Sequence, residues 1–377
     1  MSTPVLQVED LHVDVPTRRG LLHAFRGVSF SLSPGEALGL VGEAGCGKSL
    51  TLRAVLDLLP APAHVVGGRV LVDGVDITAL DRQSRRKAIS SAISMVFQDS
   101  MTALNPLMRI GDQIAVAPLA RLGYSRTGAR ARALELMRQV GIPDPERRAR
   151  AYPHQLSGGR RQRVVIAIAL SCEPPLLLCD EPTTALDVTN QAQVLKLLRG
   201  LRRDGNLAML LVTHDLAVVS ETCDRLAVMY AGRIVEDGDI GPLVLDPRHP
   251  YTFSLLRSVP DPELVRQRLL TIPGAPPGLV GGVKGCPFAP RCPFQQQDCL
   301  GLEPPLFEVE GGRHGACLHV DEARSWPGVV EVPDRGVQPG PHERASADRR
   351  RPVPALPPRV RHPGSAPAPA ARGSAGP

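Results

Sequence analysis

The feature that most constrains the fold is the glycine-rich segment at residues 42–49, Gly-Glu-Ala-Gly-Cys-Gly-Lys-Ser. It matches the G-x-x-x-x-G-K-[ST] pattern of phosphate-binding loops. An apolar run at residues 37–41 precedes it, and a helical pattern at residues 49–59 follows it. This strand–loop–helix context is the one that the pattern requires, so the segment predicts a nucleotide-binding α/β fold.

Each part of this loop has a physical role in holding phosphates. Glycines let successive backbone N–H groups turn toward one anion, and the following helix points its positive end at the same place. We expect Lys48 to reach the β- and γ-phosphates and Ser49 to offer its hydroxyl to Mg²⁺. The predicted nucleotide contacts are Gly42, Glu43, Ala44, Gly45, Cys46, Gly47, Lys48, Ser49 and Leu50.

A second chemical signal follows the apolar run at residues 176–179, where Asp180 and Glu181 stand side by side. In α/β sheets, ligands bind at the carboxyl ends of the strands. We expect Asp180 to hold Mg²⁺, directly or through water, and Glu181 to polarise the attacking water.

Apolar runs alternate with helical patterns along residues 1–245, which we interpret as one domain. Such alternation implies parallel βαβ units. The predicted strands are residues 37–41, 70–72, 94–98, 176–179, 208–213 and 226–230, and the predicted helices are residues 49–59, 129–140, 160–170, 190–203 and 216–222.

Ser157, Gly158 and Gly159 stand before another helical stretch and form a second phosphate-binding helix start. In this the sequence resembles the ATP-binding subunits of ABC transporters. In that family two chains pair head to tail, and each ATP lies between the phosphate loop of one chain and the LSGG serine of the other. The resemblance implies a P-loop NTPase fold with a mixed sheet core and a helical subdomain. Arg160 replaces the more usual hydrophobic residue, a departure that we expect to be tolerated.

The resemblance assigns roles to further residues. Gln98 is similar to the glutamine that touches Mg²⁺ and senses the membrane subunits, and His214 to the switch histidine that contacts the γ-phosphate. Asp187 ends the loop at residues 184–187, which is similar to the loop that signals between the two sites. The implied site has catalytic Glu181 and His214, Mg²⁺ ligands Ser49, Gln98 and Asp180, and nucleotide contacts that also include Gln98, Ser157, Gly158, Gly159, Gln162 and Asp187.

The aromatic residue that stacks on adenine in this family is missing in its usual form. Arg19 falls near that position, and Phe25 is the closest aromatic residue. Three interpretations stay open: Phe25 stacks on adenine, Phe25 packs in the core, or the guanidinium plane of Arg19 covers adenine.

Residues 246–320 are rich in Pro, Gly and Cys, and a short helix is predicted at residues 251–258. The region is similar to the C-terminal extension of dipeptide and oligopeptide importers in the segments at residues 244–252, 254–260, 272–278 and 285–293. From residue 321 to residue 377, Pro, Ala, Arg, Gly and Ser dominate. Such a composition cannot bury enough apolar area to fold, so it predicts a disordered tail.

Four cysteines of this extension, Cys286, Cys292, Cys299 and Cys317, are spaced C-x5-C-x6-C-x17-C. Zinc sites usually contain tight C-x2–4-C pairs, whereas cysteines without such pairs can hold an iron–sulfur cluster. The family extension is associated with a 4Fe–4S cluster, so the resemblance assigns one to these four residues. Zinc and the absence of a metal remain alternatives. We expect a structural role, because a small Pro-rich region has little core of its own.

Charge and hydropathy exclude several classes of protein. The net charge of +6 is mild, and we see no basic cluster in the first 320 residues, which argues against a nucleic-acid partner. No run approaches the roughly 20 apolar residues of a membrane span. The first residues lack the basic and apolar regions of a signal peptide. We therefore predict a peripheral protein on the cytoplasmic face of the membrane.

These features predict an ATPase subunit that energises the import of di- or oligopeptides. Its expected partners are two permease subunits, a second ATP-binding subunit (a copy or a different chain) and, indirectly, an extracellular peptide-binding protein. Nickel or another small solute is the alternative cargo. A non-transport ABC ATPase, an exporter subunit and a metal-sensing module are the other functions considered.

Overall fold

The computed structural model describes residues 3–184, 186–258 and 272–325. Among them, eight strands form a sheet in the order β11-β12-β10-β9-β3-β8-β7-β6. Strands β6, β7, β8, β3 and β9 are parallel, as the alternating pattern predicted. The bounds are β3 Ala37–Val41, β6 Ile93–Val96, β7 Leu176–Asp180, β8 Ala208–Val212, β9 Arg225–Tyr230, β10 Arg233–Asp239, β11 Phe307–Glu308 and β12 His314–Gly315.

A second, antiparallel sheet has the order β2-β1-β4-β5 within the described ranges. Its strands are β1 Leu6–Thr17, β2 Gly20–Leu32, β4 His64–Val72 and β5 Val75–Asp76. Of these, the sequence predicted only the end of β4. Register shifts interrupt β1 between Val8 and Leu11 and again after Leu11 and Val13. Such irregularities break the apolar–polar alternation by which a strand is normally recognised.

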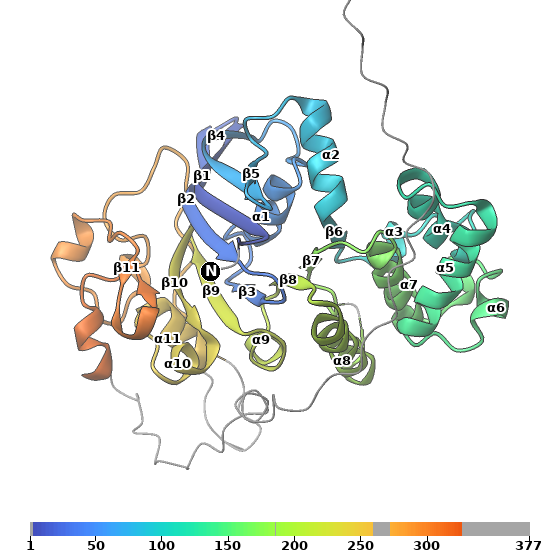
Figure 1. Cartoon of the computed structure of the whole chain (residues 1–377). Helices are drawn as coiled ribbons and strands as arrows, with labels where there is room; N and C mark the ends of the chain where they lie inside the picture. Colours follow the sequence, from blue (N-terminus) through green and yellow to red (C-terminus); the bar gives the residue numbers. More distant parts are fainter. Residues whose placement is uncertain (1–2, 185, 259–271, 326–377) are drawn as a thin grey trace, which may run out of the picture. The chain divides into compact units, whose positions relative to one another are not determined.

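Helices α3 to α7 follow β6 and gather on one side of the molecule, at the right of Figure 1. The predicted helix at residues 129–140 corresponds to α5, which begins after the N-cap Ser125. Helix α4 was missed because it contains Pro118 and has only a weak apolar stripe. The helices up to β9 are α1 Lys48–Val55, α2 Arg82–Ala92, α3 Ser100–Ala103, α4 Ile110–Arg121, α5 Arg126–Gln139, α6 Pro145–Arg148, α7 Gly158–Leu170, α8 Val188–Gly205 and α9 Leu216–Thr222.

The C-terminal extension is built onto the core of the nucleotide-binding fold. Tyr251, Phe288 and Ala316 are buried in the same hydrophobic cluster as the strands of the large sheet. The rings of Tyr230 and Tyr251 lie 4.5 Å apart, and the edge of Phe288 meets both. These residues of the predicted extension therefore share one hydrophobic core with the strands of the large sheet. Its helices are α10 Ile240–Leu245 and α11 Pro250–Arg257, and β11 and β12 extend the sheet.

Short 3-10 turns complete the described part of the chain: η1 Pro153–Gln155, η2 Ala289–Arg291, η3 Asp298–Leu300, η4 Glu310–Gly312 and η5 Val320–Ser325. Residues 326–377 of the predicted tail lie outside the described residues, as does Ala185 of the predicted signalling loop. Within the described ranges, no helix combines the length and apolarity needed to span a membrane.

Candidate functional site

The predicted phosphate loop connects β3 to α1. Its lysine is folded back over the loop: Lys48 Nζ donates to the carbonyl oxygens of Gly42 at 2.7 Å and Glu43 at 3.0 Å. Gly47 precedes α1 with a φ of 116°, a conformation that side chains rarely adopt. A Cβ at Gly42 would lie 2.2 Å from the carbonyl oxygen of Met229. Close backbone packing and positive φ therefore require glycine at these two positions.

Phe25 is buried against Gly47 of the phosphate loop. Its side chain is 1% exposed, and its ring lies 2.9 Å from the position of a Cβ at Gly47. This burial favours the core interpretation of Phe25 over stacking on adenine. Arg19 is exposed at the turn between β1 and β2.

Ser49 and Asp180 meet at the end of the loop. Ser49 Oγ donates to Asp180 Oδ1 at 2.8 Å, across 131 residues of sequence. Asp180 is buried at the carboxyl end of β7. Burial raises the pKa of the Asp180 carboxyl, while the hydrogen bond from Ser49 acts against that rise. A hydroxyl and a carboxylate at one point form the oxygen donor set that Mg²⁺ prefers, so these residues fit the metal.

Glu181 is the centre of a second group of polar side chains. Its carboxylate lies 3.1 Å from His214 Nδ1 and accepts hydrogen bonds from Thr184 Oγ1 at 2.8 Å and Gln98 Nε2 at 3.2 Å. Burial pushes the pKa of Glu181 upward, but the hydrogen bonds from Thr184 and His214 and nearby positive charges outweigh it, so the pKa is lowered. Glu181 itself has a φ of 44°, an uncommon conformation for a residue with a side chain.

The structure thus brings together three predicted residues, Gln98, Glu181 and His214, each of which follows a parallel strand. Sequence reasoning missed the contact of Thr184 with Glu181. The sequence signal for this contact was the hydroxyl of Thr184, which lies three residues after Glu181, a spacing at which side chains meet in a local turn.

Ser157 begins α7 and is exposed, and in the described part of the chain its hydroxyl makes no capping hydrogen bond. Asp187 begins α8 and accepts hydrogen bonds from the backbone and side chain of Asn190. Gly159 faces Asn190 so closely that a Cβ would lie 2.5 Å from Asn190 Oδ1. Gln162 is buried, and its Nε2 has no partner among the described residues. The nucleotide contacts of these residues stay predictions.

Glu43 has contacts that the sequence did not predict. Its carboxylate is paired with the buried guanidinium of Arg291, with Nη1–Oε2 at 2.6 Å and Nη2–Oε1 at 2.9 Å. Its backbone N–H donates to the phenol oxygen of Tyr251 at 2.8 Å. No local signal predicts these contacts, since both partners lie more than 200 residues away.

The four late cysteines line one cavity together with His249, Phe288 and His319. All four are free thiols. Burial raises the pKa of Cys286, that of Cys292 to about 11 and that of Cys317 to about 12. Four sulfur donors around one enclosed space fit a thiolate-bound metal or cluster, whose positive charge would favour the deprotonated form. His319 adds a nitrogen close to Cys299 and Asp298, so a mixed set of metal ligands is also present.

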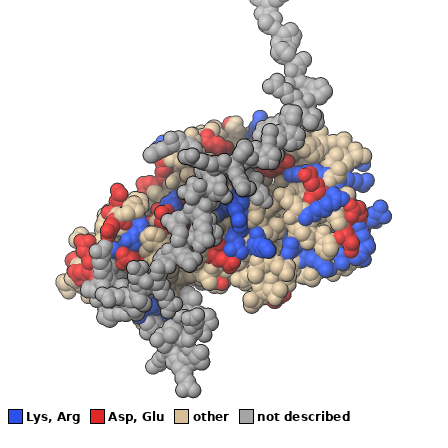
Figure 2. Space-filling view, turned by 60° about the horizontal axis from the view of Figure 1, so that its bottom comes forward, with Lys and Arg blue, Asp and Glu red and all other residues tan. Residues whose placement is uncertain are grey.

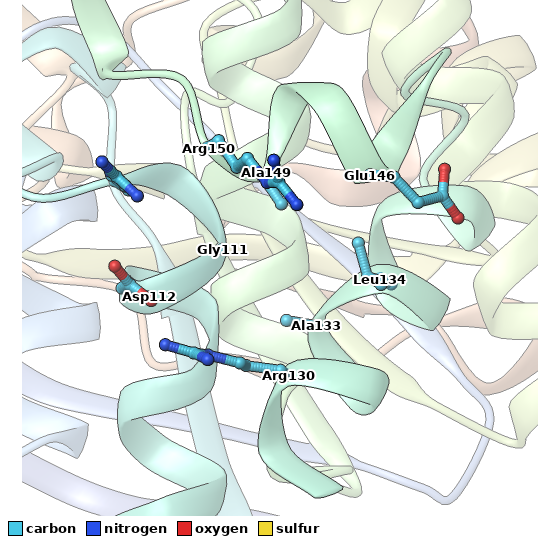
Figure 3. Close-up of a pocket in the computed structure, with 9 residues that line it drawn as sticks. Gly111, Asp112, Arg130, Ala133, Leu134, Glu146, Ala149 and Arg150 are labelled. Atoms are coloured by element: carbon cyan, nitrogen blue, oxygen red, sulfur yellow. The ribbon is translucent and has the colours of Figure 1, made fainter. Parts of the chain in front are cut away.

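A separate cavity of about 320 Å³ lies among α4, α5 and α6. Arg109, Arg130 and Arg150 line it with Asp112 and Glu146, and none of the predicted site residues does so (Figure 3). Lys and Arg side chains gather on this side of the molecule (Figure 2). Exposed arginines on and next to α5 and α6 are Arg126, Arg130, Arg138, Arg147 and Arg150. These arginines are mixed with acidic residues, and Arg138 and Arg147 are paired with Glu146 and Asp144. The expectation that the first 320 residues contain no basic cluster stays a prediction.

Comparison with known proteins agrees with the geometry. Residues 25–184 match the ABC transporter family, and residues 235–299 match the oligopeptide/dipeptide transporter C-terminal region. Among solved structures, the dimeric post-hydrolysis state of the ATP-binding cassette MJ0796 bound to ADP and Pi is similar, with a TM-score of 0.56 and 28% identity. The match covers 62% of this chain and 98% of that one. The fold and its motifs thus define an ABC-type nucleotide-binding protein.

The chain belongs to the family of ATP-binding proteins of oligopeptide and dipeptide ABC transporters. It is 48% identical to the dipeptide transport ATP-binding protein DppD of Bacillus subtilis, over 80% of this chain and 90% of that protein. It is 42% identical to DppD of Escherichia coli, over 85% and 98%. It is also 48% identical to the oligopeptide transport ATP-binding protein OppD of Mycobacterium tuberculosis, over 85% of this chain. In that last match it spans about half of the relative, 52% of its length.

Proposed function

We propose that this chain binds and hydrolyses ATP as the nucleotide-binding subunit of a peptide importer, at the cytoplasmic face of the membrane. One observation carries the ATPase assignment. The Ser49–Asp180 pair stands next to a glutamate, Glu181, that is held by Gln98, Thr184 and His214. This arrangement supports phosphate binding and water activation at the carboxyl ends of the parallel strands.

The proposed reaction begins with a change at Lys48. Its ammonium now satisfies the carbonyls of Gly42 and Glu43, and it exchanges these partners for phosphate oxygens when ATP binds. The Glu181 carboxylate, whose pKa is lowered, is ionised at neutral pH and accepts a proton from the attacking water. Thr184 and Gln98 orient that carboxylate, and His214 lies on its other side, where it reaches the γ-phosphate.

Mg²⁺ in this proposal would be held by Ser49, Asp180 and Gln98. The ion would neutralise charge on the phosphates during transfer. What the chain contributes is the pre-formed pair of oxygen donors, which lies at the start of α1 where phosphates bind.

The second half of each site comes from another ATP-binding chain, identical or different. The exposed Ser157 hydroxyl at the start of α7 supports this proposal, because its own chain leaves it without a capping contact in the described residues. A helix start that is free of internal partners can bind phosphates of a neighbouring chain. The similar ATP-binding cassettes whose structures are named dimeric also support it. Two permease subunits and an extracellular peptide-binding protein complete the proposed transporter.

The cysteine cavity is proposed to hold a 4Fe–4S cluster through Cys286, Cys292, Cys299 and Cys317. Support comes from four thiols that line one cavity. Zinc remains the rival, and the nearby nitrogen of His319 is the feature that favours it. A bound group would fix the loops of the extension, since little regular structure lies between residues 272 and 306.

One experiment tests the proposed function as a whole. The chain is co-expressed with candidate permease subunits, the complex is purified in a membrane mimetic, and ATP hydrolysis is measured with and without loaded peptide-binding protein. Peptide-stimulated hydrolysis is the expected result. If nickel or another small solute stimulates hydrolysis and peptides do not, that solute would be assigned as the cargo instead of peptides. If the chain hydrolyses ATP but no permease subunit co-purifies with it, a non-transport ATPase would be favoured.

A further inference from the structure

Arg291 connects two parts of the protein that the sequence keeps 248 residues apart. Its guanidinium is buried, and its two terminal nitrogens grip the two carboxylate oxygens of Glu43 in the phosphate loop. Its remaining contacts are to the carbonyl of Pro273 at 2.7 Å and to the hydroxyl of Tyr230 at 3.3 Å. A buried guanidinium paired with both oxygens of a carboxylate fixes position with high geometric specificity.

Three groups hold Glu43 from three sides. Its side chain is held by Arg291, its backbone N–H by Tyr251, and its carbonyl oxygen accepts from Lys48. Two of these three groups belong to the C-terminal extension. Because Glu43 lies within the loop that cradles phosphate, the extension determines where the first turn of that loop lies.

The same turn of chain that positions Arg291 also positions two cavity cysteines. The turn η2, Ala289–Arg291, lies between Cys286 and Cys292, and it is closed by hydrogen bonds from Ala289 N to Cys286 O and from Cys292 N to Ala289 O. Cys286 is tied in turn to Cys299 through its backbone N–H. A displacement of the cysteines therefore moves Arg291, and no flexible segment intervenes to absorb it.

We propose that Arg291 is a positioning residue for the phosphate loop, through which the state of the cysteine-lined cavity sets the affinity of the chain for ATP. A loaded cavity holds η2 in place and keeps the loop open to phosphate. An emptied cavity releases η2, and Glu43 loses its partner. The inference rests on the proposed ATP site, but it requires no particular metal.

The first test measures the dissociation constant of a non-hydrolysable ATP analogue with Mg²⁺, by calorimetry on the full chain purified anaerobically. Arg291→Met is expected to raise it about tenfold, within the range common for coupled sites. Arg291→Lys keeps the charge but loses the two-pronged grip, so it should give a smaller rise. Glu43→Gln breaks the same pair from the other side and guards against misfolding of the arginine variants.

Arg313→Met is the matched control. Arg313 is also a buried arginine of the extension, but its partners are Pro242, Asp246 and Glu310, and no contact with the phosphate loop is present among the described residues. It should lower thermal stability and leave the dissociation constant unchanged. Equal effects of Arg313→Met and Arg291→Met would mean a purely structural role and would overturn the proposal, as would an unchanged constant in all three Arg291 and Glu43 variants. The same titration of the wild type tests the ATP site itself. A wild type that does not bind the analogue would contradict the ATP site, whereas a wild type that binds it, with variants that bind equally well, would contradict only the role of Arg291.

A double-mutant cycle tests the link to the cavity. Cys317→Ser alters the cavity far from η2 in sequence and should raise the dissociation constant about as much as Arg291→Met does, about tenfold. In the Arg291→Met background it should have no further effect, since the connection is already broken. Additive effects of the two substitutions would show that the cavity does not act through Arg291.

Discussion

The imidazole of His214 lies 3.1 Å from the carboxylate of Glu181, although 33 residues separate them in sequence. The two residues follow neighbouring parallel strands, β8 and β7, whose carboxyl ends meet at one edge of the sheet. Gln98, which follows the end of β6, donates a hydrogen bond to the same carboxylate. The position of the strands, rather than any local sequence, thus brings these three side chains together.

Glu181→Gln should abolish hydrolysis while leaving ATP binding intact. The amide keeps the size of the side chain and can accept a hydrogen bond from Thr184, but it is a far weaker proton acceptor than the carboxylate. We expect the ATPase rate to fall by about 100-fold or more, as for loss of a general base. Steady-state hydrolysis and analogue binding are measured on the same preparation. Glu135→Gln, which alters an exposed carboxylate on α5, is the control and should keep the wild-type rate. Full hydrolysis by the Glu181 variant would remove the assigned role.

Ser157→Asp should prevent ATP-driven pairing of chains. Aspartate is a good N-cap residue, so α7 should still form, but its negative charge repels the phosphates of a partner's nucleotide. In the non-hydrolysing Glu181→Gln background, light scattering with ATP is expected to report paired chains, and the added Ser157→Asp substitution should leave single chains. Ser125→Asp makes the same change at the exposed N-cap serine of α5 and should not affect pairing. Paired chains in the Ser157→Asp protein would contradict the shared site.

The elements that sequence predicted and those that it missed differ in a physical property. Strand β7 is buried along its whole length, so its continuous apolar run and the acids after it are visible without the fold. The phosphate loop is also local, because its glycines act through their own backbone. In contrast, β1 is interrupted by register shifts, and the ion pair of Arg291 with Glu43 joins residues that no pattern relates.

Cys299→Ser and Cys317→Ser should each lower the metal content of the chain. Both side chains line the cavity, and a cluster that loses one of four thiolates is expected to be less stable. Iron, zinc and acid-labile sulfide are measured after anaerobic purification, together with the visible spectrum. Iron and sulfide in equal amounts are expected in the wild type. Cys172→Ser, outside the cavity, is the control and should keep the wild-type content. Zinc without sulfide would replace the cluster, and a metal-free wild type with unchanged stability would remove the site.

Glu236 should make the stability of the protein depend on pH. Its carboxyl is fully buried and accepts hydrogen bonds from the backbone N–H groups of Arg248 and His249, and burial raises its pKa to about 7. The unfolded chain has the ordinary value of about 4.3. The folded state therefore binds the proton more tightly, so this contribution to stability is fully present below the unfolded pKa and is lost as the pH rises through 7.

Glu236→Gln removes this titrating group. The quantity to measure is therefore the difference in the free energy of unfolding between the variant and the wild type. Urea unfolding at pH 5 and pH 8 should show that the variant gains about 2 to 3 kcal/mol relative to the wild type over that interval, whatever the constant cost of the substitution. Glu308→Gln, at an exposed position on β11, should show no such change. Subtracting the wild-type free energy of unfolding from that of the variant cancels the contributions of other groups that titrate alike in both proteins. A variant whose relative stability is the same at both pH values would mean that Glu236 is ionised in the folded protein at pH 5, held so by the two N–H donors.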